Sequence, residues 1–241
     1  KYMKLTLNNL NKCYKDKVAV KDISFEVNHG ETIGILGPNG AGKTTLFYMI
    51  AGLIKCDSGE IRIEDTKIND KSISKRTELG LSYLPQESSI FRGLTVQENI
   101  LAALQQNPSL NKEKMHLKMV NLLRDFRLDT FSSTKGIKLS GGERRRTEIA
   151  RALASDPKFI LLDEPFAGID PLAVTDLKKI INELNKKNIG VLISDHNVRD
   201  TMNICNRVLI VNKGEIIADG HPEEISNDPL VKEVYLGENF N

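Results

Sequence analysis

The chain has 241 residues, 40% of them hydrophobic and 27% charged, and its net charge is +2 at pH 7. This balance is ordinary for a globular protein, and the low net charge gives no reason to expect a nucleic-acid partner. No apolar run reaches the roughly 18–20 residues of a membrane span, and the first residues have no apolar segment like that of a signal peptide. Cys13, Cys56 and Cys205 are odd in number and far apart, which argues against a disulfide framework or a metal site and leaves each as a small apolar filler.

Alternating apolar and polar residues predict strands at 5–7, 23–27 and 60–64. The turn Asn28-His29-Gly30 closes the second of these stretches, and Asp57-Ser58-Gly59 precedes the third. We expect these strands to form an antiparallel sheet.

Residues 37–45 fit the phosphate-binding loop pattern G-x-x-x-x-G-K-[ST] and read Gly37, Pro38, Asn39, Gly40, Ala41, Gly42, Lys43, Thr44, Thr45. Glycines let consecutive backbone N–H groups wrap a polyphosphate, because no Cβ stands in the way. The lysine places a positive charge on the β- and γ-phosphates, and the threonine hydroxyl ligates Mg²⁺. An apolar strand at 31–36 precedes the loop, and a helix at 45–51 offers its N-terminus to the anion.

The middle of the chain, residues 96–131, predicts helices rather than strands, because its apolar residues recur at helical spacing. Those residues are Ile100, Leu101 and Leu104, then Leu117, Val120, Leu123 and Phe126. Asn107-Pro108-Ser109 separates the two helices. We interpret this part as a helical insertion.

Three short apolar runs follow at 159–163, 190–194 and 207–211, separated by helical segments. Runs of this kind are typical of parallel strands that are covered on both faces. The first run ends in Asp163 and Glu164 before Pro165. Asp163 is suited to hold Mg²⁺, and Glu164 to orient or deprotonate an attacking water; the alternative is a pair of solvated acids.

Ser140, Gly141, Gly142 and Glu143 stand before a helix predicted at 144–154. Ser140 and Glu143 fit a capping box, which would by itself explain these residues. The exposed N–H groups of a helix start, with glycines for close approach, also make an anion site.

Leu139 to Glu143 resembles the signature motif of ABC ATPases, which usually ends in Gln rather than Glu. The resemblance implies an α/β fold, a P-loop NTPase core with a mostly parallel sheet, an antiparallel β subdomain and a helical subdomain. It implies one ABC ATPase domain over 1–241, with the helical subdomain at about 88–158 and a C-terminal tail at about 220–241.

The resemblance also implies roles for further residues. Tyr14 would stack on the adenine of ATP, Gln86 would reach Mg²⁺ and the water, and His196 would contact the γ-phosphate. Catalysis would then rest on Glu164, His196, Lys43 and Gln86, with Thr44, Gln86 and Asp163 around Mg²⁺. In a head-to-tail homodimer, residues 140–143 and the D-loop residue Asp170 would close over the ATP of the other subunit.

Two departures from the family pattern concern the coupling between the two ATP sites. The D-loop has Ala-Gly at 167–168 where many members have Ser-Ala, and Asn197 follows the histidine where many have Asp.

Segments 83–92, 139–151, 159–170, 194–199 and 234–240 are most similar to the family branch that powers lipopolysaccharide export. This similarity implies two transmembrane permease subunits of the LptF and LptG type docking near Phe91 and Arg92, and a single-span subunit of the LptC type. The ATPase would lie peripherally on the cytoplasmic face of the inner membrane, without direct contact with the lipid or with nucleic acid.

Two alternatives remain at this point. One is the ATPase of a branched-chain amino-acid importer, and the other is a soluble ABC ATPase that acts on DNA or ribosomes. The run Arg144-Arg145-Arg146 is interpreted as a solvated helix face with ion pairs to the core rather than a nucleic-acid patch.

Overall fold

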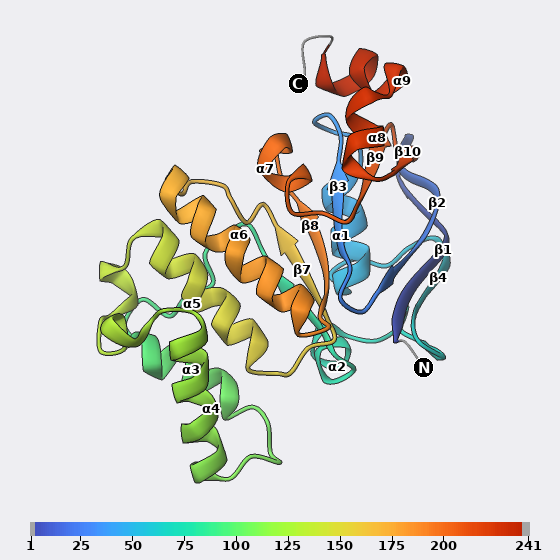
Figure 1. Cartoon of the computed structure of the whole chain (residues 1–241). Coiled ribbons are helices and arrows are strands. Elements are labelled where there is room, and N and C mark those ends of the chain that lie inside the picture. The colour runs from blue at the N-terminus through green and yellow to red at the C-terminus, as the bar shows by residue number, and fades with distance from the viewer. Residues whose placement is uncertain (1–2, 238–241) are drawn as a thin grey trace.

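The computed structural model describes residues 3–237. Of the tail segment at 234–240, the last three residues lie outside this range, so that part of the similarity has no structural counterpart here. The predicted α/β architecture is confirmed, with two sheets of different kinds and helices between and beside them (Figure 1).

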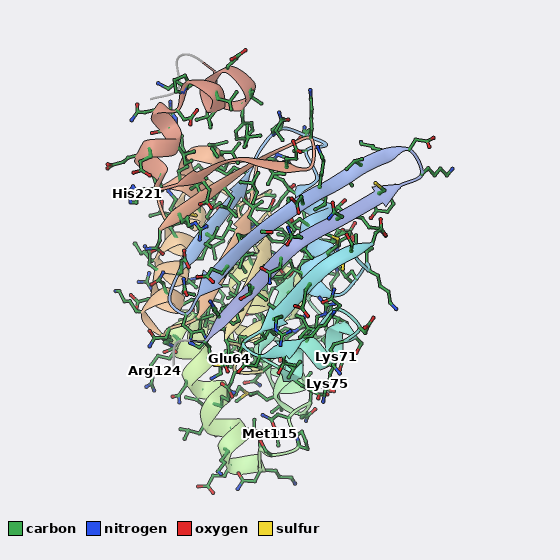
Figure 2. All side chains as sticks on the ribbon, turned by 90° about the vertical axis from the view of Figure 1, so that its right-hand side faces the viewer. Glu64, Lys71, Lys75, Met115, Arg124 and His221 are labelled. Atoms are coloured by element: carbon green, nitrogen blue, oxygen red, sulfur yellow. The ribbon has the colours of Figure 1, made fainter. Side chains whose placement is uncertain are left out.

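The first sheet is antiparallel and comes from the N-terminal part of the chain, as the alternation predicted. Its strands lie in the order β2 (Lys17–Asn28), β1 (Lys4–Tyr14), β4 (Ser58–Ile63) and β5 (Thr66–Lys67). Figure 2 looks onto the outer face of this sheet, with β1, β2 and β4 side by side. Strands β1 and β2 are longer than the predicted segments.

The second sheet has six strands, five of them parallel. The order is β10 (Glu215–Gly220), β9 (Arg207–Asn212), β3 (Thr32–Leu36), β8 (Gly190–Ser194), β7 (Phe159–Asp163) and β6 (Leu81–Leu84). Strand β10 runs antiparallel to β9, and the other neighbours pair in parallel. The three apolar runs predicted as parallel strands are confirmed as β7, β8 and β9.

The parallel strands are buried on both faces because two hydrophobic clusters cover them. In β7, Ile160 and Leu162 belong to one cluster, and Phe159 and Leu161 belong to the other. The second cluster also contains the inner face of the antiparallel sheet and α1 (Lys43–Ala51), which therefore lies between the two sheets (Figure 1). This continuous burial explains why the strands lack alternation.

The first cluster lies on the opposite face of the six-stranded sheet and is largely helical. Its main helices are α3 (Val96–Leu104), α4 (Lys112–Asp125), α5 (Gly141–Leu153) and α6 (Pro171–Lys186). Shorter elements complete the described chain: α2 (Ile73–Glu78), η1 (Asp129–Phe131), η2 (Gly136–Lys138), α7 (Val198–Met202), α8 (Pro222–Asn227), α9 (Pro229–Val231) and η3 (Lys232–Leu236). Within residues 3–237, no helix has the length and apolarity needed to cross a membrane.

Leu117 lies in a helix as predicted but is 62% exposed, because the buried stripe of α4 runs through Met119, Leu122 and Leu123. One expectation about packing is wrong. Cys13 is exposed rather than a core filler, whereas Cys205 is buried.

Candidate functional site

The loops that follow β3, β7 and β8 meet at one edge of the six-stranded sheet, because the carboxyl ends of parallel strands lie together. Strand β8 separates β3 from β7. Asp163 at the end of β7 stands opposite Ser194 at the end of β8. The backbone N–H of Glu164 donates to the carbonyl of Ser194 at 2.6 Å, which fixes the turn out of β7 beside the next strand.

The phosphate-binding loop depends on glycine at two positions. Gly37 has φ +148, and a Cβ there would lie 2.0 Å from the carbonyl oxygen of Val211. Gly42 has φ +108, and a Cβ there would lie 2.1 Å from the carbonyl oxygen of Ala19. Gly42 is also the N-cap of α1 and makes no side-chain capping bond. The first N–H groups of α1 are thus open to an anion.

Lys43 folds back over the loop that precedes it. Its ammonium Nζ donates to the carbonyls of Gly37 at 2.6 Å and Pro38 at 3.0 Å. Burial lowers the pKa of Lys43, and the charges of Glu164 and Asp163 partly oppose this effect. A buried ammonium that holds only neutral carbonyls is suited to exchange them for a phosphate.

A cleft of about 390 Å³ opens above the loop. It is lined by Tyr14, Lys17, Ala19, Asn39, Gly40, Ala41, Gly42, Lys43, Thr44, Thr45, Glu164, Ser194 and His196. The sequence singled out all of these except Lys17, Ala19 and Ser194. Ser194 was identifiable as the polar residue that ends an apolar parallel strand, whereas Lys17 and Ala19 reach the cleft only through the β1–β2 hairpin.

Tyr14, expected to stack on adenine, lies at the end of β1 and lines this cleft. Its side chain is 46% exposed. The ammonium of Lys12 lies 5.5 Å from the ring centroid of Tyr14. The ring is therefore accessible for stacking from the cleft.

Glu164 is held between two polar side chains. The amide Nε2 of Gln86 donates to Oε2 of Glu164 at 2.6 Å, and Nε2 of His196 lies 2.7 Å from Oε1. The backbone of Glu164 has φ +46, a left-handed conformation that is uncommon for glutamate. A residue that the surroundings hold in this way points to a functional role for its carboxylate.

Asp163 is nearly buried, and burial raises the pKa of its carboxyl. The hydroxyl of Tyr83 donates to its Oδ2 at 3.1 Å. Burial and the nearby negative charge of Asp163 raise the pKa of Tyr83, so the tyrosine stays a donor. The expected magnesium ligands Thr44, Gln86 and Asp163 offer oxygen atoms of the kind Mg²⁺ prefers, and a cation would offset the burial of the aspartate.

Asp195 holds the loop that carries His196 in place through hydrogen bonds. The sequence motifs predicted no role for this residue. It is 3% exposed, and its carboxylate accepts from the backbone N–H of Phe166 and of Asn197, both at 2.8 Å. The bond to Phe166 ties the loop after β8 to the loop after β7, and the bond to Asn197 closes a turn around His196.

The signature residues do not line this cleft, and they form the predicted capping box. Ser140 caps α5: its Oγ accepts from the N–H of Glu143 at 3.3 Å, and its own N–H donates to Glu143 at 2.8 Å. A Cβ on Gly142 would lie 2.6 Å from Cβ of Ala173 in α6. Asp170 caps α6 in turn. Residues 140–143 and Asp170 are not among those that line the cleft. Gly141 alone of them lines a smaller cavity of about 140 Å³ together with Gln86 and Glu164.

A buried ion pair in α5 joins the loop of Gln86 to the end of β7. Arg145 and Glu148 are 6% and 3% exposed and lie 3.2 Å apart. Arg145 donates to the carbonyls of Pro85 and Asp163, both at 2.9 Å. The expectation that Arg144-Arg145-Arg146 forms a solvated face is wrong for Arg145, which is buried, and its ion pair is made within α5.

Glu148 of the same ion pair also contacts the segment that follows Gln86. Its Oε1 accepts from the hydroxyl of Ser88 at 2.6 Å and from the N–H of Ser89 at 2.9 Å. The segment that follows Gln86 is therefore fastened to α5.

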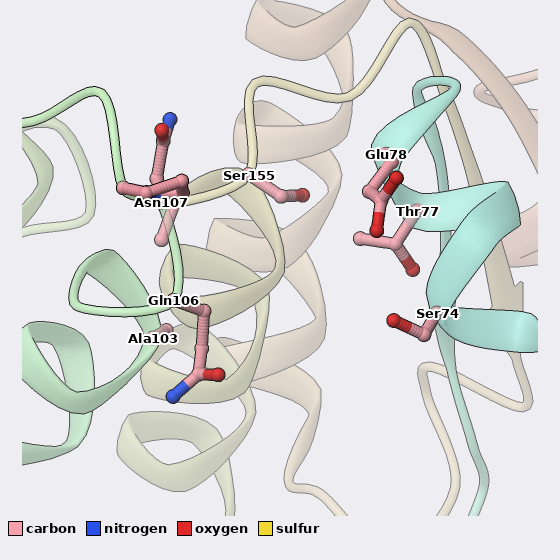
Figure 3. A pocket seen from close by; sticks show the side chains of 9 residues that line it. Ser74, Thr77, Glu78, Ala103, Gln106, Asn107 and Ser155 are labelled. Atoms are coloured by element: carbon pink, nitrogen blue, oxygen red, sulfur yellow. The ribbon is translucent and has the colours of Figure 1, made fainter.

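A groove lies between α2 on one side and α3 and α5 on the other. Two cavities of about 450 Å³ each lie along it and share Thr77, Ala103, Gln106 and Ser155. Figure 3 shows Ser74, Thr77 and Glu78 on α2 facing Gln106, Asn107 and Ser155 across the first cavity.

Phe91 lines the second cavity of the groove. Its side chain is 50% exposed, and the guanidinium of Arg151 lies 4.5 Å from its ring centroid. Arg92 is exposed and is not among the residues that line either cavity.

Comparison with known proteins agrees with this geometry. A family model described as ABC transporter matches residues 20–167, and one described as branched-chain amino acid ATP-binding cassette transporter matches residues 215–241. The chain is 52% identical to the lipopolysaccharide export system ATP-binding protein LptB of Haemophilus influenzae over 236 residues, which cover 98% of each chain.

Two solved structures extend the comparison. The ADP conformation of MJ1267, an ATP-binding cassette of an ABC transporter, has a TM-score of 0.87 at 29% identity and covers 99% of this chain and 100% of that chain. The dimeric post-hydrolysis state of the cassette MJ0796, bound to ADP and Pi, has a TM-score of 0.79 at 27% identity and covers 90% and 98%. The chain belongs to the family of ATP-binding cassette ATPases of ABC transporters.

Proposed function

We propose that this chain is the ATP-hydrolysing subunit of an inner-membrane ABC transporter that extracts lipopolysaccharide and exports it to the outer membrane. The observation that carries the proposal is the 52% identity to LptB over 98% of both chains. The whole of residues 1–241 then forms one ATPase domain, with a helical subdomain at about 88–158 and a tail from about 220.

ATP binds with its phosphates on the loop of residues 37–45 and its adenine against Tyr14. Glu164 accepts a proton from the attacking water, and the contacts with Gln86 and His196 hold its carboxylate for this step. Lys43 neutralises phosphate charge, and His196 contacts the γ-phosphate. Mg²⁺ held by Thr44, Gln86 and Asp163 would supply further charge neutralisation when bound.

The second half of each site comes from a second copy of the chain. Residues 140–143 and Asp170 do not line the cleft of their own chain, and they close over the ATP of the partner in a head-to-tail homodimer. The match to a dimeric cassette supports this arrangement.

A helix from each of two permease subunits docks in the groove between α2 and α3. Phe91 is the apolar anchor, and the exposed Arg92 lies next to it in sequence. The protein is peripheral on the cytoplasmic face of the inner membrane, and a single-span subunit of the LptC type completes the assembly without contact between this chain and the lipid.

One observation favours a second candidate, the ATPase of a branched-chain amino-acid importer. The C-terminal residues 215–241 match the family model that carries that description. The export proposal has the stronger support, because the LptB similarity covers nearly the whole chain, including this segment.

The test is to purify the tagged protein from detergent-solubilised membranes of its host, identify its companions by mass spectrometry, and measure the ATPase rate of the complex. Two export permeases and a single-span subunit, with a rate that responds to lipopolysaccharide, are expected. Importer permeases, with a rate that responds to an amino-acid binding protein, would overturn the export proposal and leave the ATPase assignment in place.

A further inference from the structure

Tyr83 contacts a residue of the nucleotide site and also lines the groove between α2 and α3. Its hydroxyl donates to Asp163 Oδ2 at 3.1 Å. Tyr83 also lines the second cavity of the groove, together with Phe91 and Arg151. It is thus one side chain with a contact in each of two sites.

The sheet register explains how Tyr83 reaches Asp163. Tyr83 on the edge strand β6 stands opposite Leu161 on β7. Side chains alternate between the faces of a strand, so Asp163, two residues further on, projects from the same face as Leu161. The phenol therefore spans diagonally from β6 to the carboxylate at the tip of β7.

The ring of Tyr83 is also held from the side of the phosphate-binding loop. Tyr48 of α1 packs edge-on against it, with ring centroids 6.3 Å apart and an interplanar angle of 83°. Its position therefore depends on α1 as well as on β6 and on the groove.

We propose that Tyr83 is a positioning residue that orients Asp163 for the divalent ion accompanying ATP and transmits occupancy of the groove to that carboxylate. The inference rests on the function proposed above. Donors behind a metal ligand fix its orientation and typically change metal affinity when removed. Because the ring and hydroxyl of tyrosine form one rigid unit, a helix that presses on the ring from the groove displaces the hydroxyl from Asp163.

The test removes the hydroxyl and keeps the ring, with Tyr83→Phe. Mn²⁺ is the probe, and its binding to the isolated protein with ADP is measured by electron paramagnetic resonance. Calorimetry measures ADP binding in the presence of EDTA. We expect Mn²⁺ affinity to fall about 10-fold, with metal-free ADP affinity unchanged.

Ser82→Ala is the matched control. Ser82 precedes Tyr83 on β6, lines the same cavity, and bonds to Ser155 and the carbonyl of Ala152 rather than to Asp163. We expect it to bind Mn²⁺ as the native protein does. Native Mn²⁺ affinity in Tyr83→Phe, or equal losses in both variants, would overturn the positioning role. Failure of the native protein to bind ADP would overturn the nucleotide site itself, and the role of Tyr83 with it.

The groove part of the proposal needs the assembled transporter. We expect native Mn²⁺ affinity to differ between the isolated subunit and the purified complex, and the difference to be lost in Tyr83→Phe. Equal native affinities in the two states would overturn the transmission from the groove.

Discussion

The imidazole Nε2 of His196 lies 2.7 Å from Oε1 of Glu164. The histidine follows β8 and the glutamate follows β7, which are neighbouring strands of the parallel sheet. With Gln86 on the other carboxylate oxygen, this contact engages both oxygens of Glu164, which lines the cleft.

Glu164→Gln should therefore retain ATP binding and lose turnover, by about 100-fold or more, because the amide cannot accept the proton of the water. The protein should accumulate as a dimer, which light scattering with ATP and Mg²⁺ would detect. Glu183→Gln makes the same chemical change on an exposed residue of α6 and should leave turnover unchanged. A variant that remains monomeric with ATP would contradict the head-to-tail dimer.

Glu148→Gln should destabilise the protein, because it leaves the buried guanidinium of Arg145 without its charged partner. Breaking a buried ion pair from one side costs about 3–5 kcal/mol. A melting temperature lower by about 10 °C is expected for a chain of this size, measured by calorimetry. Glu113→Gln on the exposed start of α4 is the control. Equal melting temperatures for both variants would show that the pair contributes little.

Arg76→Met should also be strongly destabilising. The Arg76 side chain is 2% exposed and donates to four backbone carbonyls, two of which, those of Met49 and Ile50, belong to the last turn of α1. The contacts to Met49 and Ile50 are the two buried ones. Leaving a buried acceptor unpaired costs about 1–3 kcal/mol, so a loss on the order of 2–6 kcal/mol is expected in urea unfolding. Arg124→Met, at an exposed position of α4, should change the unfolding free energy by less than about 0.5 kcal/mol; a similar value for Arg76→Met would refute this account.

Phe91→Ala should leave nucleotide binding unchanged and weaken assembly with the permeases, because it removes the apolar anchor of the groove. Co-purification from membranes and ADP calorimetry measure the two effects separately. Leu117→Ala removes another exposed apolar side chain, from α4 and away from the groove. If both variants recover the permeases as well as the native protein does, Phe91 is not part of the docking surface.

The sequence predicted best what a short segment determines by itself. The phosphate-binding loop needs glycine at Gly37 and Gly42 because of local backbone conformation, and both the loop and the capping box at Ser140 formed as expected. The three parallel strands were recognisable because burial on both faces makes each of them continuously apolar.

What the sequence missed depends on contacts between distant segments. Tyr83 meets Asp163 through strand pairing, and Arg145 meets Pro85 across a helix and a loop. Neither partner is encoded by spacing along the chain. The exposure of Leu117 has a similar origin, since packing against α3 decides which face of α4 is buried.

Residues 140–143 and Asp170 do not line the cleft of their own chain. In the proposed dimer, the rate of ATP hydrolysis would therefore depend on how often two subunits meet. In that arrangement, a free subunit at low concentration would rarely meet a second copy and would hydrolyse little ATP. In the proposed complex, two permeases that each tether one subunit would raise the local concentration of each subunit for the other to about the millimolar range. Attachment to the permeases would then switch on ATP hydrolysis, and subunits without permeases would hydrolyse little ATP.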